Sequence, residues 1–389
     1  IEIGRGYWKF NVSLLKDRAY VGYIRGIIRQ ARETRGDGDW DDPGEWWDFL
    51  KFLLRAETVA YCREKEEKRR EYVAALLREK EELENDVWYG IGGEEAGADL
   101  RRIYHLLEEE EGRKAEGHRV RARVPNFGAK EPGLAYISKI EKWTGGRNLI
   151  YALKDREGRV RYGTEGVLDI AHEFYTDLYT SQGTDEQAQD EILDALDSTL
   201  TPESRDMCDA RVTAEELAES LRGLQNGKSP GSDGFPAEFW KCFWGELSAD
   251  FMAVVDWVYN NGRLTGSMAG GIIRLLFKKG DRLDVRNYRP ITLVNADYKI
   301  ISKTIARRMA KVLPELIHPD QTCVPGRHIS TNIHVLRDVV EYCDGADTEG
   351  ALLFLDQEKC FDRVEHGFIF RVMAKMGYGE DFIKWVRIF

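Results

Sequence analysis

Residues 271–311 read GIIRLLFKKGDRLDVRNYRPITLVNADYKIISKTIARRMAK, and this stretch decides the fold that we expect. Ile272 to Phe277 is an apolar run of strand length, and the Lys-Lys-Gly-Asp sequence at 278–281 is typical of a turn. Ile291 to Val294 is a second short apolar piece. Asn295 is a residue type that caps helices, and the apolar residues after it recur on one helical face as far as Leu313. The stretch therefore predicts strand, turn and helix in succession.

The same stretch is strongly basic, with eleven Lys and Arg against three Asp and no Glu, although the whole chain carries a net charge of −11. The local charge is therefore a better guide to partners than the net charge, and phosphate groups are its natural partners. A solvated face is the alternative for the helical part. The basic side chains around the turn are Lys278, Lys279, Arg286 and Arg289, and those along one helical stripe are Lys299, Lys303 and Arg307.

Most of the remaining chain has helical patterns, so we expect a predominantly helical α+β protein. Residues 46–85 predict one long helix, exposed where nine charged residues run from Arg63 to Glu71. Residues 99–111 predict a helix that pairs with it in antiparallel fashion. The other expected elements are a hairpin turn at 154–160, a helix at 166–180, a linker or exposed loop at 183–192, a helix after a capping box at Thr213, a loop at 226–236, and helices at 236–245 and 247–261.

Composition excludes several classes of protein. At about 150 residues per domain, 389 residues predict two or three domains. No apolar run approaches the roughly 20 residues that a membrane-spanning helix needs. The six cysteines are scattered singly with no Cys-x-x-Cys, which favours a reducing, intracellular setting over a disulfide scaffold or a zinc ribbon. The chain has no secretory signal and no initiator Met, so we expect a fragment.

Two short patterns resemble functional sites but are not interpreted as such. Gly223 to Ser229 looks like a phosphate-binding P-loop, but it has three residues between its glycines where the motif needs four, and a helix is expected before it. Cys323, His328 and His334 fit no common zinc spacing, so we interpret them as ordinary residues.

The sequence Leu352-Leu-Phe-Leu-Asp-Gln-Glu-Lys-Cys-Phe-Asp362 is the best candidate for a catalytic element. Ala351 to Leu355 predicts a strand buried on both faces, which ends at Asp356. A carboxylate held at the end of a buried strand suits a divalent cation such as Mg²⁺, which prefers oxygen ligands. Taken alone, such an Asp is also typical of a turn or a cap.

Four blocks occur in a specific order: Asn226-Gly-Lys-Ser-Pro-Gly-Ser-Asp-Gly-Phe-Pro-Ala-Glu-Phe239, Asn287-Tyr-Arg-Pro-Ile-Thr-Leu293, Asp320-Gln-Thr-Cys-Val-Pro-Gly-Arg327 and Phe354-Leu-Asp-Gln-Glu-Lys-Cys-Phe-Asp362. Together they resemble the successive blocks of a non-LTR (LINE-type) retrotransposon reverse transcriptase. Gly6 to Asn11 is similar to the stretch that follows the endonuclease in such polyproteins. The resemblance implies a helical linker over 1–205, and the fingers and partial palm of a right-hand polymerase over 206–389.

The resemblance also implies roles for individual residues. Asp356 would be the catalytic, metal-binding carboxylate of the palm, and Phe361 the steric gate beneath the incoming sugar. Arg289 would hold the triphosphate, assisted by Lys278 or Lys279. The loop from Gln321 to Arg327 would lie near the template. The loop 226–236, with Lys228 and Ser229, would grip template RNA, and the basic helix with Lys299, Lys303 and Arg307 would contact nucleic acid.

One departure from the family is decisive for activity. Two metal ions need several carboxylates, and the family supplies the others from an Ala/Val/Tyr-x-Asp-Asp block that this sequence lacks. We therefore expect an RNA-directed DNA polymerase fragment that is inactive alone, with Mg²⁺, template RNA, primer DNA and deoxynucleotides as the implied cofactor and partners. Resemblance implies the nucleus and cytoplasm as its location. The alternatives are a non-catalytic RNA-binding module and a helical scaffold built on residues 44–117.

Overall fold

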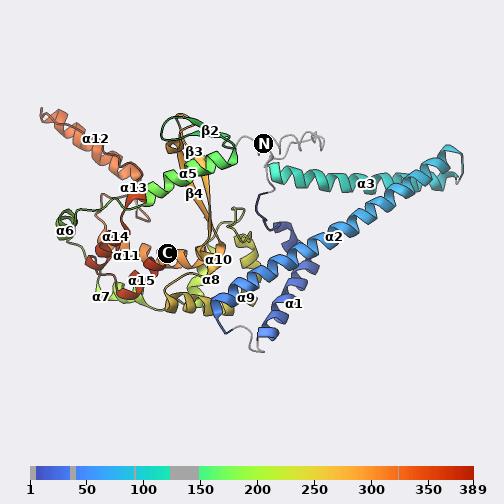
Figure 1. Ribbon diagram of the computed structural model, residues 1–389, viewed down its shortest axis with the longest axis horizontal. Coiled ribbons are helices and arrows are strands. Elements are labelled where there is room, and N and C mark those ends of the chain that lie inside the picture. The colour runs from blue at the N-terminus through green and yellow to red at the C-terminus, as the bar shows by residue number, and fades with distance from the viewer. Residues whose placement is uncertain (1–5, 36–40, 92, 123–148, 323) are drawn as a thin grey trace. The chain divides into compact units, whose positions relative to one another are not determined.

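The computed structural model describes residues 6–35, 41–91, 93–122, 149–322 and 324–389 (Figure 1). The chain divides into two compact units, one formed by residues 1–55 and 169–389 and the other by residues 56–168. The described part is mainly helical, with two antiparallel two-stranded sheets. The expected α+β, predominantly helical class is therefore confirmed. No helix in the described ranges has both the length and the apolar character needed to cross a membrane.

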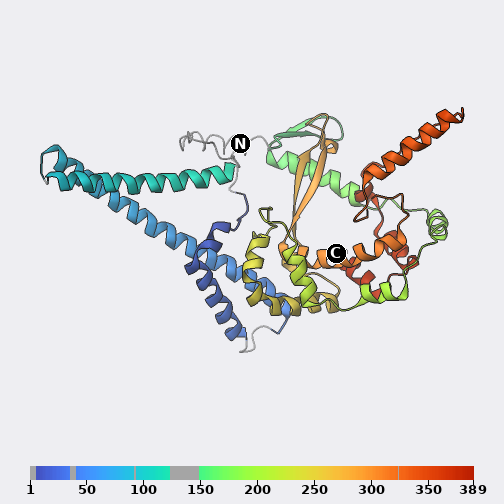
Figure 2. The same cartoon turned by 180° about the vertical axis from the view of Figure 1, so that it is seen from behind.

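Two long helices dominate residues 56–168. The helix α2 (Pro43–Trp88) contributes its part after residue 55, and α3 (Gly93–Ala122) runs back along it. Arg69 of α2 pairs with Glu110 of α3 at 2.7 Å, and Tyr104 of α3 donates to Glu84 near the end of α2 at 2.5 Å. The lower-numbered of these α2 residues pairs with the higher-numbered α3 residue, so the two helices run antiparallel, as expected. Their joined ends are visible in both views (Figures 1 and 2).

The hairpin expected around 154–160 also lies in residues 56–168. Strands β1 (Ala152–Lys154) and β2 (Val160–Tyr162) pair antiparallel with Leu153 opposite Arg161. Gly158 has φ +80, a left-handed conformation that glycine adopts at little cost. The helix α5 (Gly163–Tyr179) follows, close to the predicted range of 166–180.

The core of the unit formed by residues 1–55 and 169–389 surrounds the helix α9 (Ala237–Asn261). Nine of its residues are buried, including Trp240, Phe243 and Phe251. The first turns of α2 pack against it, because Trp47 stacks on Trp240 with ring centroids 5.3 Å apart and also meets Phe251. Further elements of this core are η1 (Val12–Lys16), α1 (Arg18–Thr34), α7 (Pro202–Asp209), α8 (Ala214–Arg222) and α10 (Gly266–Ala269).

The stretch 271–311 folds largely as its sequence predicts. Strand β3 (Gly271–Phe277) pairs with β4 (Tyr288–Val294), the short 3-10 helix η3 (Val285–Asn287) lies in the connection, and α11 (Ala296–Leu316) follows. The capping box at Thr213 is also present, with Thr213 and Glu216 bonding each other's backbone N–H groups. Asn295 precedes α11, but its side chain makes no capping bond, because it is used elsewhere.

Three expectations about local structure are wrong. The helices expected at 236–245 and 247–261 are one continuous helix, since no proline interrupts α9. The stretch 183–192, expected as a linker or loop, forms α6 (Glu186–Asp194), which Asp185 caps by accepting from the Ala188 N–H. Residues 351–355 form no strand; a strand needs a neighbour, and within the described ranges each sheet already consists of two strands that pair only with each other.

The remaining helices lie at the C-terminal end of the chain. They are α12 (Ile329–Gly345), which has no buried residue, α13 (Cys360–Arg363), α14 (His366–Lys375) and α15 (Glu380–Ile388). Helix α15 is amphipathic, and its Phe382 and Trp385 are buried in the core that contains α9. The predicted boundary at residue 205 between a linker and a polymerase region stays a prediction.

Candidate functional site

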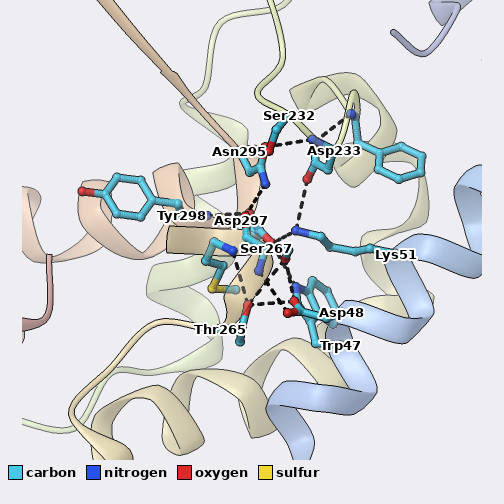
Figure 3. Close-up of polar contacts among 12 residues, drawn as sticks. Trp47, Asp48, Lys51, Ser232, Asp233, Thr265, Ser267, Asn295, Asp297 and Tyr298 are labelled. Atoms are coloured by element: carbon cyan, nitrogen blue, oxygen red, sulfur yellow. Dashed lines mark hydrogen bonds and ion pairs between the residues drawn. The ribbon is translucent and has the colours of Figure 1, made fainter. Parts of the chain in front are cut away.

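The best-organised candidate site is the loop 226–236 and the buried polar residues beneath it (Figure 3). Lys51, from the first turns of α2, lies at the centre of this group. Its Nζ donates to Asp297 Oδ2 at 2.6 Å and lies 3.2 Å from Asp233 Oδ2. Asp297 is in the first turn of α11 and Asp233 is in the loop. One amine therefore joins three segments that are far apart in sequence.

The electrostatics of this cluster follow from its burial, since the Lys51 side chain is 4% exposed, that of Asp297 0% and that of Asp233 7%. Burial alone would lower the pKa of Lys51, but Asp297 and Asp233 outweigh it and raise that pKa. Burial and the neighbouring charge of Asp297 raise the pKa of Asp233. Lys51 is therefore a cation that two buried carboxylates share.

Neutral donors complete the environment of each carboxylate. Trp47 Nε1 donates to Asp297 Oδ2 at 2.9 Å, and the Tyr298 N–H donates to its Oδ1 at 2.8 Å. Asp233 Oδ1 accepts from the Phe235 N–H at 3.0 Å. Asp233 Oδ2 has no aligned hydrogen bond among the described residues, so its ion pair with Lys51 is the contact that stabilises its charge.

Asn295 holds the middle of the loop. Its Oδ1 accepts from the Asp233 N–H at 3.2 Å, and its Nδ2 donates to the Ser267 carbonyl at 2.7 Å. Gly231 lies so close that a Cβ there would overlap Asn295 Oδ1 and the backbone at the end of β4. The buried position of Asn295 thus explains why its side chain does not cap α11, and it places the loop at the base of the β3–β4 hairpin.

The outer half of the loop is tied to α9 and to the N-terminal segment. Glu238 accepts from the Gly227 N–H, and Lys241 donates to Asn226 Oδ1 at 2.8 Å. The Tyr7 hydroxyl donates to the Pro230 carbonyl at 2.9 Å. Between these ties, Lys228 is exposed and Ser229 is half-buried. The fixed loop therefore presents Lys228 to solvent.

The hairpin places the basic residues of the turn. Leu276 is opposite Arg289, and the Lys278 N–H donates to the Asn287 carbonyl at 2.9 Å. Asn287 also donates to the Asp281 carbonyl at 3.0 Å, which closes the turn. Lys278, Lys279, Arg286 and Arg289 are exposed, and Arg286 also pairs with Asp284 at 2.7 Å. All four predicted basic side chains of the turn thus lie at the surface.

The predicted basic stripe along α11 contacts other parts of the protein. Lys299 is half-buried, and burial lowers its pKa. Lys303 donates to the Gly223 carbonyl at the end of α8, and Arg307 pairs with Glu219. Arg308 is buried and holds Glu216 together with the carbonyls of 208, 210 and 211. This helix is therefore bound to α8 and its surroundings, and contact of Lys299, Lys303 and Arg307 with nucleic acid stays a prediction.

The loop from Gln321 to Arg327 follows α11. Arg327 donates to the carbonyls of Ile317, His318 and Gln321, so its guanidinium satisfies backbone groups at the end of that helix. Gln321 is exposed. Cys323 of the dismissed metal pattern lies outside the described residues.

The block around Asp356 has a very different environment. Residues 351–358 are exposed; Leu353 is 81% exposed, Phe354 80% and Leu355 84%. Phe361, the implied steric gate, is 97% exposed. The described structure therefore does not bring Asp356 or Phe361 together with the loop 226–236 or with Arg289 in a closed site.

The described residues do not make a complete magnesium site. Within the described ranges, no three His, Cys, Asp or Glu side chains are grouped so as to hold a metal ion. Asp356 alone supplies too few of the oxygen ligands that Mg²⁺ requires.

The residues missed by sequence reasoning are those that hold the loop, namely Lys51, Asp233, Asn295 and Asp297. A signal for Lys51 exists in Glu45-Trp-Trp-Asp-Phe-Leu-Lys51-Phe-Leu-Leu54, where one cation interrupts a run of large apolar residues. A lone cation among large apolar residues implies a buried partner of opposite sign. Which partner it meets is not visible in the sequence.

Comparison with known proteins agrees with these motifs. Residues 277–389 match the family described as reverse transcriptase (RNA-dependent DNA polymerase). The chain is 31% identical over 384 residues to the Transposon TX1 uncharacterized 149 kDa protein of Xenopus laevis. The match covers 98% of this chain and 29% of that protein, so the chain spans less than a third of its relative. Residues 277–389 therefore match a reverse transcriptase domain, and the resemblance of this chain to a fragment of a non-LTR (LINE-type) retrotransposon polyprotein is confirmed.

Proposed function

We propose that this chain contributes the fingers and the start of the palm of a right-hand RNA-directed DNA polymerase, and that its own biochemical activity is binding of template RNA. The observation that carries the proposal is the loop 226–236, which is tied to the base of a basic hairpin through Asp233 and to α9 through Asn226, and which exposes Lys228. Phosphate groups are bound by cations that the protein holds in place.

The surface basic residues of the hairpin support a nucleotide-binding role. Lys278 and Lys279 lie in a turn that Asn287 closes and Arg289 lies in the adjoining strand β4, so their backbones are fixed while their charges stay in water. In the proposed roles, Arg289 holds the triphosphate of a deoxynucleotide with help from one of the two lysines. Gln321 lies near the template. Asp356 and Phe361 act at the metal ion and the sugar in an assembled palm.

Binding without catalysis is the function we assign to the isolated chain. Two observations favour it: the exposed, strandless segment 351–358, and the lack of a paired-Asp block in the sequence. Phosphoryl transfer depends on positioning and charge stabilisation more than on covalent chemistry by the protein, so an incomplete set of carboxylates removes most of the rate. Under this proposal the chain acts inside the cell, in the nucleus and cytoplasm.

Salt-dependent RNA binding is the test of this proposal. The purified chain and its Lys228→Ala variant are titrated with a labelled single-stranded RNA at several salt concentrations. We expect affinity to fall steeply with salt, and the log–log slope to be smaller by about 0.7 in the variant, the value for one lost phosphate contact on a single strand. An unchanged slope in Lys228→Ala would exclude the loop as an RNA contact.

Primer extension tests the proposal that the isolated chain binds nucleic acid without catalysis. With an RNA template, a DNA primer, deoxynucleotides and Mg²⁺, we expect the chain to bind the primer–template and add no nucleotide. Extension that Asp356→Asn abolishes would show that the chain is catalytically complete and would overturn the assignment.

A further inference from the structure

We propose that Lys51 and Asp233 are positioning residues for RNA binding: their buried ion pair fixes the loop 226–236 so that Lys228 reaches the RNA backbone. The inference rests on the proposed function of the loop. It assigns a role in template binding to α2, whose residues 46–51 the sequence interpretation places in a linker.

Several contacts join the loop 226–236 to the core. Asp233 meets Lys51 through its side chain and Asn295 through its N–H. Phe235, two residues further along, is fully buried and packs on Phe239 with ring centroids 4.3 Å apart. Asp233 thus ties the buried part of the loop, which also contains Pro230 and Gly231, to the core, and the exposed part with Lys228 precedes it.

The ion pair between Lys51 and Asp233 is hard to replace by another contact. Asp297 has its own donors in Trp47 and Tyr298, whereas Asp233 Oδ2 depends on Lys51. Loss of Lys51 would leave a buried carboxylate uncompensated, and the loop would have to move to hydrate it. Such movement reaches Lys228 through only four residues, which include Pro230 and Gly231.

Lys51 and Asp233 would act by positioning the loop and not by direct contact with RNA. Lys51 and Asp233 are buried, and RNA cannot touch them in this arrangement. Any effect of the pair on RNA must therefore pass through the exposed part of the loop. Coupling between Asp233 and Lys228 is the consequence that can be measured.

The experiment is a double-mutant cycle of Asp233→Asn and Lys228→Ala in the full chain, measured by titration with single-stranded RNA at several salt concentrations. Asn at 233 keeps an acceptor for the Phe235 N–H and removes the charge that Lys51 holds. We expect each single variant to lose about fivefold in affinity and to reduce the salt slope by about 0.7, and the double variant to lose no more than either alone.

Asp250→Asn is the matched control. Asp250 is also a buried carboxylate, bonded to Arg32 at 2.8 Å and to Trp46 Nε1 at 3.2 Å, but it joins α9 to α1 and α2 and has no bond to the loop. We expect it to lower thermal stability and to leave the RNA salt slope unchanged. If Asp233→Asn does not fold, Asp233→Glu, which keeps the charge and displaces it, replaces it with the same expectation.

Each outcome decides one of the two claims. Additive effects of the two substitutions, or full affinity in Asp233→Asn, would overturn the positioning role while the RNA-binding loop stands. A Lys228→Ala variant with unchanged affinity and slope would instead overturn the RNA-binding loop, and the positioning role with it.

Discussion

Two motif blocks of this chain, 226–236 and 351–362, are equally recognisable in sequence but differ in structure. The first is held by Lys51, Asn295, Tyr7 and α9, and its Phe235 is fully buried. In the second, residues 351–358 and Phe361 are exposed, and Phe354 is 80% exposed. A sequence motif alone does not hold a segment in place, whereas contacts from distant elements do. Within the described residues, only the first block has many such contacts.

The largest effect that we expect comes from Lys51→Met. The substitution leaves two buried carboxylates without their cation, which costs close to the upper end of the ~3–5 kcal/mol range for a broken buried pair. Urea unfolding measures it. Lys68→Met, on the exposed part of the same helix where Lys68 pairs with Glu64, is the control and should leave the unfolding curve nearly unchanged. Equal curves for the two variants would contradict the buried network.

Phenylalanine truncation compares the two blocks directly. Phe235→Ala removes a fully buried ring and should cost about 3 kcal/mol in the free energy of unfolding, because a cavity remains. Phe354→Ala removes an exposed ring and should change the free energy of unfolding by less than about 0.5 kcal/mol. A large loss in Phe354→Ala would mean that the second block is buried in solution, and the contrast between the blocks would disappear.

Glycine substitution tests how closely the loop contacts Asn295. Gly231→Ala places a Cβ against the Asn295 side chain and the backbone at the end of β4, so we expect a loss of about 2 kcal/mol by overpacking. Gly245→Ala is the matched control, since no atom lies within 4 Å of a Cβ at that helical position. Alanine there should be neutral or stabilising by up to about 1 kcal/mol. Thermal unfolding of both variants checks the difference.

The smallest effect depends on pH. Burial would raise the pKa of Glu216, but hydrogen bonds from Arg308 and the Thr213 backbone outweigh it and lower that pKa. A carboxylate with a lowered pKa stabilises the fold above its unfolded pKa of about 4.3 and loses this contribution as pH falls through the folded pKa. Glu216→Gln should therefore cost about 1 kcal/mol at pH 7 and much less at pH 3. Glu215→Gln, at the exposed neighbouring position, is the control and should leave the free energy of unfolding at pH 7 nearly unchanged.

Several elements were predictable because their causes are local. The capping box at Thr213, the hairpin turn at Gly158 and the strand from Ile272 each depend on residues close together in sequence. Helix α6 was missed because its acidic, Gln-rich composition is also typical of a linker; Asp185 as its cap was the available signal.

The candidate site was only partly predictable. Lys228, Arg289 and Asp356 were found because blocks of sequence carry them, and the family assignment that rests on those blocks is confirmed. The predicted strand at 351–355 failed because five apolar residues indicate burial but do not provide a neighbouring strand. The functions of the individual site residues stay predictions.

Sequence alone establishes the family resemblance, the mainly helical class and the basic character of residues 271–311. Tertiary structure decided that Lys51 meets Asp233 and Asp297, that Asn295 holds a loop in place of capping a helix, and that Lys303 and Arg307 contact α8. The physical reason is the distance along the chain over which each interaction acts. Capping and periodicity act over a few residues, whereas a buried charge must find a partner that the fold brings from far along the chain.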